Sequence, residues 1–145
     1  MPPEVWHNAP MSQAAAIPVV PSPPFTLGWR EVERGVPISV LEEFCAYSGF
    51  ALKDLLEVVI PARTLKHRRR RQESLSLDES DRLARVARIY ELAVKVYTDR
   101  EDGRTWLTGP KARFDGKTAL AMLRTEAGEQ AVQDFLIQID EGYFA

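Results

Sequence analysis

Apolar residues recur at three- and four-residue steps along most of the second half of the chain, which is the period of an amphipathic α-helix. The longest such run extends roughly from Leu77 to Thr98, and its apolar face is wide enough to contact two partners. Arg82, Arg85 and Arg88 line another face of the same run. A last run begins after Thr125, which we expect to cap its first turn. No stretch shows a convincing strand pattern, so the sequence predicts an all-α fold.

Two helix starts carry the spacing of a capping box, in which a serine and a glutamate three residues later bond each other's backbone amides. Ser39 and Glu42 have this spacing, and so do Ser76 and Glu79. Gly49 stands where a glycine can end the first of these helices in a left-handed conformation. The signals predict one helix that ends at Gly49 and a second that starts near Ser76.

Shorter elements are predicted around these two helices. The stretch from Ala51 to Val58 has the pattern of a short helical segment, and Pro61 suits the first turn of the helix that follows it. Further along, a segment from Arg104 to Thr108 starts after Gly103 and is closed by Gly109. We therefore expect Gly103 to mark a break between two helices.

The segment from Arg63 to Arg71 gathers positive charge in one place. It carries six formal positive charges and no acidic residue, although the whole 145-residue chain has a net charge of −2. Its residues are good helix formers, so we expect a short basic helix, the second helix of a helix-turn-helix. Such a patch attracts phosphates by releasing their counterions. A solvated charged face, or a contact for an acidic protein, fits the run equally well.

The side chains of this segment fall on different sides of the expected helix. One face, expected to discriminate bases, contains Arg63, Lys66, His67 and Arg70. Arg68 and Arg71 drift to the flank of that face, where they would mainly hold phosphates. The candidate DNA contacts are Arg63, Thr64, Lys66, His67, Arg68, Arg69, Arg70 and Arg71.

Composition places the chain among globular proteins. With 45% hydrophobic residues, it can form one ordinary domain or two very small ones. Seven of its ten prolines lie in residues 1–27, which we expect to form a flexible arm. The longest apolar runs are too short to span a membrane, and we see no signal peptide, so we expect a cytoplasmic protein.

Patterns of catalytic or metal-binding residues are missing from the sequence. Cys45 is the only cysteine, and one cysteine with two histidines cannot supply the ligands of a metal site. The sequence has no glycine-rich phosphate loop and no arrangement typical of a Ser-His-Asp triad. We therefore predict that the protein is not an enzyme and has no cofactor or metal.

Four sequence pieces occur in an order that resembles a known family. The first opens a helix at Gly35–Ser39 (GVPIS), and the second is Pro61–Leu65 (PARTL) with basic residues after it. The third is Leu75–Val86 (LSLDESDRLARV), and the fourth runs from Trp106–Pro110 (WLTGP) through Gly116–Leu120 (GKTAL) and Arg124–Gly128 (RTEAG) to Gly142 and Tyr143. Over roughly Leu27 to Ala145, the set resembles the Xre/MbcA/ParS antitoxin family, the partners of RES-domain toxins.

Two positions depart from the pattern of this family. Lys111 follows Pro110 where the family commonly has an asparagine, and Ala119 stands where the family often has a proline. These departures concern loop detail and touch neither the basic helix nor the C-terminus. The proline-rich arm lies outside the resemblance.

The resemblance implies two functional regions after the arm. Residues 28–75 would form an Xre-like helix-turn-helix that binds operator DNA, and residues 76–145 a helical region for dimerisation and toxin binding. It further implies a homodimer that represses its own operon and blocks, by direct contact, a RES-type toxin that consumes NAD. The alternative is a helix-turn-helix transcriptional regulator without a toxin partner, and a third possibility is an adaptor whose basic helix binds an acidic protein.

The last six residues are two acids, a glycine, two adjacent aromatic residues and an alanine. Tyr143 and Phe144 would either fold back on the core of the protein itself or anchor in a pocket of the toxin. A toxin site built for the phosphates of NAD should be basic, and the acidic tail would match it. The candidate toxin contacts are Gln133, Ile137, Asp140, Glu141, Gly142, Tyr143, Phe144 and Ala145.

Overall fold

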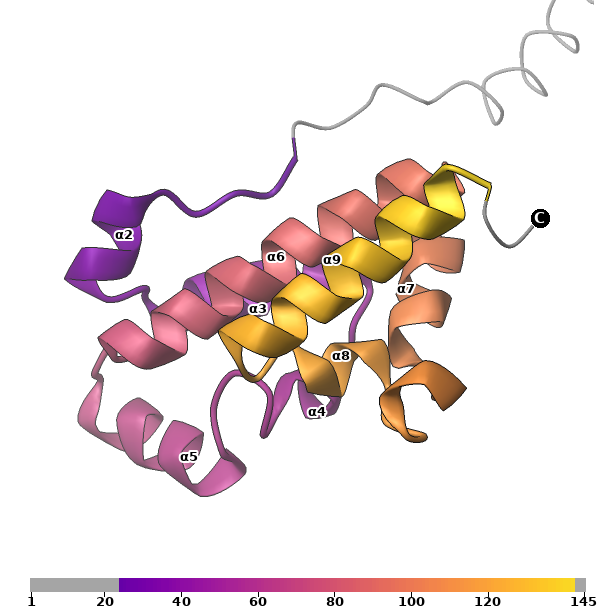
Figure 1. Cartoon of the computed structure of the whole chain (residues 1–145). Helices are drawn as coiled ribbons and strands as arrows, with labels where there is room; N and C mark the ends of the chain where they lie inside the picture. Colours follow the sequence, from indigo (N-terminus) through magenta and orange to yellow (C-terminus); the bar gives the residue numbers. More distant parts are fainter. Residues whose placement is uncertain (1–23, 143–145) are drawn as a thin grey trace, which may run out of the picture.

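The computed structural model describes residues 24–142, and every regular element in this range is helical (Figure 1). The helices are α2 (Trp29–Arg34), α3 (Ile38–Ser48), α4 (Leu52–Leu55), α5 (Ala62–Arg71), α6 (Leu77–Tyr97), α7 (Arg100–Thr108), α8 (Ala119–Met122) and α9 (Glu126–Asp140), with a 3-10 turn η1 (Ala112–Phe114). The only extended pairings within residues 24–142 are two isolated bridges. The all-α prediction is confirmed.

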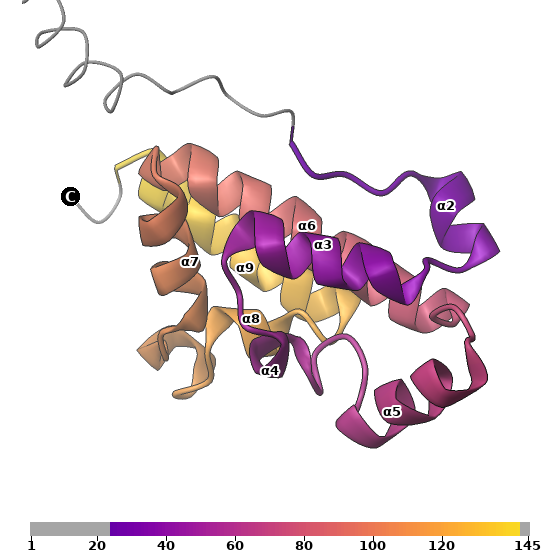
Figure 2. The same ribbon diagram turned by 180° about the vertical axis from the view of Figure 1, so that it is seen from behind.

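Helix α6 is the central element of the described fold. It lies beside α9, and the two helices run in the same direction, while α3 packs on another side (Figures 1 and 2). Its apolar side chains, among them Leu83, Val86, Tyr90 and Ala93, are fully buried against the neighbouring helices of the same chain. The wide apolar face of this helix is therefore covered within one chain and does not by itself call for a second copy.

The two expected capping boxes have different outcomes. The box at the start of α6 is confirmed, because the Glu79 amide donates to Ser76 Oγ at 3.1 Å and the Ser76 amide donates to Glu79 Oε1 at 2.8 Å. The box at Ser39 is wrong, because α3 already begins at Ile38 with Pro37 as its N-cap residue and has no side-chain cap.

Long-range contacts explain the earlier start of α3. The Val36 amide donates to Ser80 Oγ at 2.8 Å, and the Val36 carbonyl accepts from the Leu75 amide, also at 2.8 Å. These bonds hold the chain just before Pro37, whose fixed φ of −61° suits the cap position. At its other end α3 behaves as predicted, because Gly49 adopts a left-handed φ of 84°.

The segment expected to be helical from Ala51 to Val58 forms only the four-residue helix α4. The helix ends because Leu56 adopts an extended backbone, and Glu57, with a positive φ of 72°, then begins a turn through Val58 and Val59 to Ile60, in which the Glu57 amide donates to the Ile60 carbonyl at 3.0 Å. All three of these β-branched side chains are buried, whereas a helix would turn consecutive side chains to different sides. Pro61 also disfavours a helical conformation for the residue that precedes it.

Gly103 is not the break that the sequence suggests. Helix α7 begins at Arg100, and the Asp99 carboxylate caps it by accepting from the Asp102 amide at 2.8 Å. Gly103 is buried inside this helix, where a Cβ atom would lie only 3.0 Å from the Val94 backbone nitrogen of α6. The glycine therefore allows α6 and α7 to approach closely. None of the helices within residues 24–142 is long and apolar enough to cross a membrane.

Candidate functional site

Helix α5 is held on the surface by a small number of apolar contacts. Leu65 is its one buried residue, and the buried Ile60 lies directly before its N-cap residue, Pro61. Gln72 ends the helix in a left-handed conformation with φ of 55°. Because only one side of this ten-residue helix is buried, most of its basic side chains face outward.

One face of α5 presents cations to solvent. The exposed side chains of Arg63, Lys66, His67 and Arg70, together with Ala62, line an open hollow of about 480 Å³. No carboxylate within residues 24–142 forms an ion pair with any of these four side chains. The structure thus brings together the four residues that the sequence places on one helical face, and the charges of Arg63, Lys66 and Arg70 are available to an external partner.

Arg68 has a different position and points toward α6. Its Nε donates to Glu79 Oε1 at 2.8 Å, and its Nη2 donates to Glu79 Oε2 at 3.2 Å, which forms a bidentate pair. The Glu79 side chain is only 7% exposed. Burial alone raises the pKa of this carboxyl, but hydrogen bonds from Arg68 and from the Ser76 amide outweigh burial and hold the pKa below its ordinary value. Arg68 therefore fastens α5 to the first turn of α6.

The remaining predicted DNA contacts are Arg69, Arg71 and Thr64. Arg69 pairs with Glu42 at 3.0 Å, and Arg71 pairs with Glu73 at 3.2 Å, both at the surface. Thr64 is half-buried. The sequence pattern did not separate the paired arginines from the unpaired ones, because their carboxylate partners are contributed by other elements.

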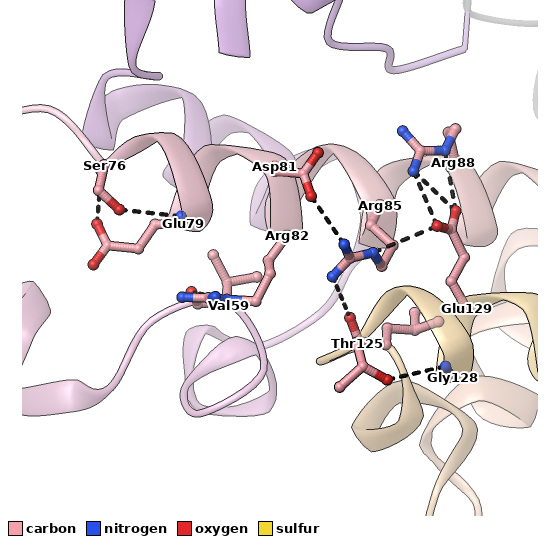
Figure 3. A network of polar contacts seen from close by, with 11 residues as sticks. Val59, Ser76, Glu79, Asp81, Arg82, Arg85, Arg88, Thr125, Gly128 and Glu129 are labelled. Carbon is pink, nitrogen blue, oxygen red and sulfur yellow. Dashed lines mark hydrogen bonds and ion pairs between the residues drawn. The ribbon is translucent and has the colours of Figure 1, made fainter. Parts of the chain in front are cut away.

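A second polar cluster, missed by the sequence patterns, joins α6 to α9 (Figure 3). Arg85 is buried, and its guanidinium reaches Asp81 Oδ2 at 2.9 Å, the Leu123 carbonyl at 3.2 Å and Glu129 Oε1 at 3.4 Å. Arg88 adds a further ion pair to Glu129 at 2.9 Å. Glu129 therefore ties the first turn of α9 to two arginines of α6.

We expect a Glu129→Ala substitution to lower the free energy of unfolding by about 2 kcal/mol, because it would leave the buried Arg85 guanidinium without one of its charged partners. Arg88→Ala is the matched control. The Arg88 side chain is 55% exposed, and an exposed ion pair contributes only a few tenths of a kcal/mol. Chemical denaturation of both variants measures the difference, and equal losses would contradict the role assigned to Arg85.

Helix α9 carries the described part of the predicted toxin contacts. Thr125 caps the helix as expected, because its Oγ1 accepts from the Gly128 amide at 3.0 Å. On the outer side, Ile137 is 39% exposed and lies near the exposed Asp140 and Glu141 in sequence. Gln133 is half-buried, and Gly142 has a φ of 82°. Tyr143, Phe144 and Ala145 lie outside the described residues.

Metal-binding or nucleophilic chemistry finds little support in the described fold. Residues 24–142 contain no group of three or more His, Cys, Asp or Glu side chains that could hold a metal ion. Cys45 is half-buried, and burial together with the Asp54 and Glu42 carboxylates raises the pKa of its thiol. A protonated thiol is a poor nucleophile.

The fold and the basic face define the class of protein. A short basic helix, α5, follows the very short α4 and stands at the surface, which is the arrangement of a helix-turn-helix. Of the helices that follow α6, α7 and α9 pack against it, and α8 packs against α7 and α9. The class is thus an all-α helix-turn-helix protein with an additional helical unit at its C-terminal side.

Comparisons with known proteins identify the family. Residues 30–88 match the antitoxin Xre-like helix-turn-helix domain, and residues 92–142 match the antitoxin Xre/MbcA/ParS C-terminal toxin-binding domain. The chain belongs to the Xre/MbcA/ParS antitoxin family. This family is a regulatory one without enzymatic activity, which confirms the prediction that the chain is not an enzyme. The two matched stretches meet inside α6.

Three relatives illustrate the similarity. The antitoxin Xre of Pseudomonas putida is 46% identical over 85 residues, which are 59% of this chain and 54% of that protein. The antitoxin Xre of Yersinia enterocolitica is 25% identical over 116 residues, or 79% of this chain and 78% of that protein. The antitoxin Xre of Photorhabdus laumondii is 26% identical over 113 residues, or 77% and 76%. The match to the first of these spans only about half of its length.

Proposed function

We propose that this protein is the antitoxin of a type II toxin-antitoxin pair, with operator DNA bound through α5 and the toxin bound through α9 and the residues that follow it. The observation that carries the DNA-binding half is the open face of α5, where four basic side chains have no carboxylate partner within residues 24–142. The toxin-binding half rests on the match of residues 92–142 to a toxin-binding domain.

Repression of its own operon follows from this proposal. Cations without internal partners release counterions when they meet DNA phosphates, and Arg side chains can read guanine edges in the major groove. A footprint of the purified protein on the DNA upstream of its own gene tests this function. Protection of a discrete site supports an operator, whereas salt-dependent binding without a preferred site would leave only non-specific attraction.

The partner that we infer is a RES-type toxin that consumes NAD. An outer face of α9 with an exposed Ile137 beside acidic residues suits a partner that offers an apolar contact within a basic surround. A site that holds the phosphates of NAD would be basic for the same electrostatic reason. If no toxin is encoded beside this gene and none is bound, the protein would instead be a regulator that binds DNA alone.

Deletion of Tyr143–Ala145 is expected to weaken neutralisation of the toxin while fold and DNA binding stay unchanged. Loss of an aromatic anchor costs about 2 kcal/mol, or roughly 30-fold in affinity, when it fills a pocket of a partner. Co-expression of the toxin with the truncated protein, scored by growth and by cellular NAD, measures the effect. Normal growth and a normal NAD level would show that Tyr143–Ala145 do not inhibit the toxin. The inhibitory contacts would then be Gln133, Ile137 and Asp140 of α9.

We also propose that the protein forms a homodimer. A two-fold symmetric pair would place two α5 helices about one DNA turn apart, as a palindromic operator requires. The support is this symmetry and not the apolar face of α6, which the chain covers with its own helices. Light scattering of the full chain at micromolar concentration is expected to give twice the mass of the monomer, and a monomeric mass would refute the proposal.

A further inference from the structure

A second basic hollow lies beside the start of α5, between the helix-turn-helix and the toxin-binding domain. It encloses about 840 Å³. Three cations line it, and each comes from a different element: Arg82 from α6, Lys117 from the segment before α8, and Arg124 from the turn between α8 and α9. Glu57 is the single carboxylate in its lining. The hollow therefore carries an excess of positive charge in an otherwise slightly acidic protein.

These cations are available to an external anion. Arg82 uses its Nε to donate to the Val59 carbonyl at 3.1 Å, which positions the guanidinium at the hollow, and no acceptor within residues 24–142 takes up its two terminal nitrogens (Figure 3). Lys117 and Arg124 are exposed and form no ion pair or side-chain hydrogen bond with the described residues. Of the two acidic residues in the first turn of α9, Glu129 is already held by Arg85 and Arg88, and Glu126 forms no ion pair with the cations of the hollow within residues 24–142.

This hollow is continuous with the basic face of α5. Pro61 lines the second hollow, and Ala62, the next residue, lines the first. Both views show the loop that leads into α5 beside the turn between α8 and α9. When a helix enters a groove of DNA, the phosphates along the edges of that groove lie next to the helix. Cations beside the N-terminal end of the helix can therefore contact these phosphates.

We propose that this hollow binds the phosphate backbone of operator DNA, so that Lys117 and Arg124 of the toxin-binding domain contribute to the DNA interface together with Arg82. The inference rests on the proposed DNA-binding function and extends it. Since Lys117 and Arg124 lie in the stretch that matches a toxin-binding domain, one part of the chain would contact both partners. Phosphate contacts carry no sequence information, so this hollow would strengthen binding without selecting a sequence.

The test is a Lys117→Ala/Arg124→Ala variant of the full chain, titrated at several salt concentrations against two labelled duplexes by fluorescence anisotropy. One duplex covers the DNA upstream of the gene, and the other is a scrambled duplex of the same length. We expect roughly tenfold weaker binding to both duplexes, and a salt slope shallower by about one for each cation removed per bound copy. Lys95→Ala, an exposed lysine of α6 outside both hollows, is the control and should leave the slope unchanged.

The outcomes separate this inference from the proposed function. If the wild type binds the upstream duplex but the double variant has the same affinity and slope as Lys95→Ala, the second hollow is not a phosphate site and the DNA-binding function stands. If the double variant loses toxin binding in a pull-down while its salt slope is intact, the hollow belongs to the toxin interface and the inference is wrong. A wild type that binds neither duplex would overturn both.

Discussion

An Arg63→Ala/Arg70→Ala variant is expected to bind operator DNA at least 30-fold more weakly than the wild type. The reason is that a bidentate contact from arginine to guanine contributes about 1 to 3 kcal/mol, and two well-separated contacts add. Both side chains are exposed in the same open hollow of α5, and no carboxylate within residues 24–142 pairs with them. This loss of DNA affinity requires no change in the fold or the packing of the chain.

Two comparisons sharpen this result. The double variant should unfold at the temperature of the wild type, within about 2 °C, because surface substitutions without partners change stability by less than about 0.5 kcal/mol. It should also lose preference for the operator over a scrambled duplex, since base contacts carry the specificity. Arg71→Ala, which removes an exposed arginine paired with Glu73, should have a smaller effect on affinity and little effect on specificity. Operator affinity that is unchanged in the double variant would sink the assignment of this face.

Arg68→Ala is expected to act on stability, with a loss of about 3 kcal/mol in the free energy of unfolding and about 10 °C in Tm. The substitution leaves the nearly buried Glu79 carboxylate without its bidentate partner, and an uncompensated buried charge costs several kcal/mol. We place the figure at the low end of that range because the Arg68 side chain is 23% exposed, so water screens part of the interaction. Thermal and urea denaturation at neutral pH measure both quantities.

A double-mutant cycle distinguishes the ion pair from other effects of Arg68. Adding Glu79→Gln to Arg68→Ala should recover part of the lost stability, because a neutral amide needs no charged partner and can still accept from the Ser76 amide. Purely additive losses would show that the two side chains are not coupled. If Arg68→Ala lowers DNA affinity by more than the unfolded fraction of the variant accounts for, Arg68 would be a phosphate contact, as the sequence predicts.

The same pair predicts a dependence on pH. The pKa of Glu79 is lowered in the folded protein. The ion pair with Arg68 therefore contributes its full stability at pH values above the pKa of this carboxyl in the unfolded chain. That contribution is lost as pH falls through the lower pKa of the folded protein. In Arg68→Ala, burial would dominate and raise the pKa of Glu79 instead. The stability difference between the wild type and this variant should therefore be largest at neutral pH, begin to shrink as pH falls through the raised pKa of Glu79 in the variant, and shrink further as pH falls through the lowered pKa in the wild type. A difference that stays constant down to acidic pH would contradict the ion-pair explanation.

Helix limits were predictable where the signal and its partner lie within one turn. Ser76 with Glu79, Gly49 and Thr125 act where the sequence places them, because a cap needs only the backbone amides or carbonyls of its own helix. Ser39 carries the same local signal and fails. There, the contacts of Val36 with Ser80 and Leu75, elements far along the chain, hold the backbone so that α3 begins earlier.

The sequence alone determined that the protein is helical, that positive charge gathers on one short helix, and which four side chains share its outer face, because helical period and local charge are properties of contiguous residues. Only the tertiary structure decided which arginines remain available. Arg68 and Glu79 are 11 positions apart in the sequence. Glu129 lies 41 positions after Arg88 and 44 positions after Arg85. Whether such side chains meet depends on how the helices pack, and the same packing decided that Gly103 joins two helices closely instead of separating them.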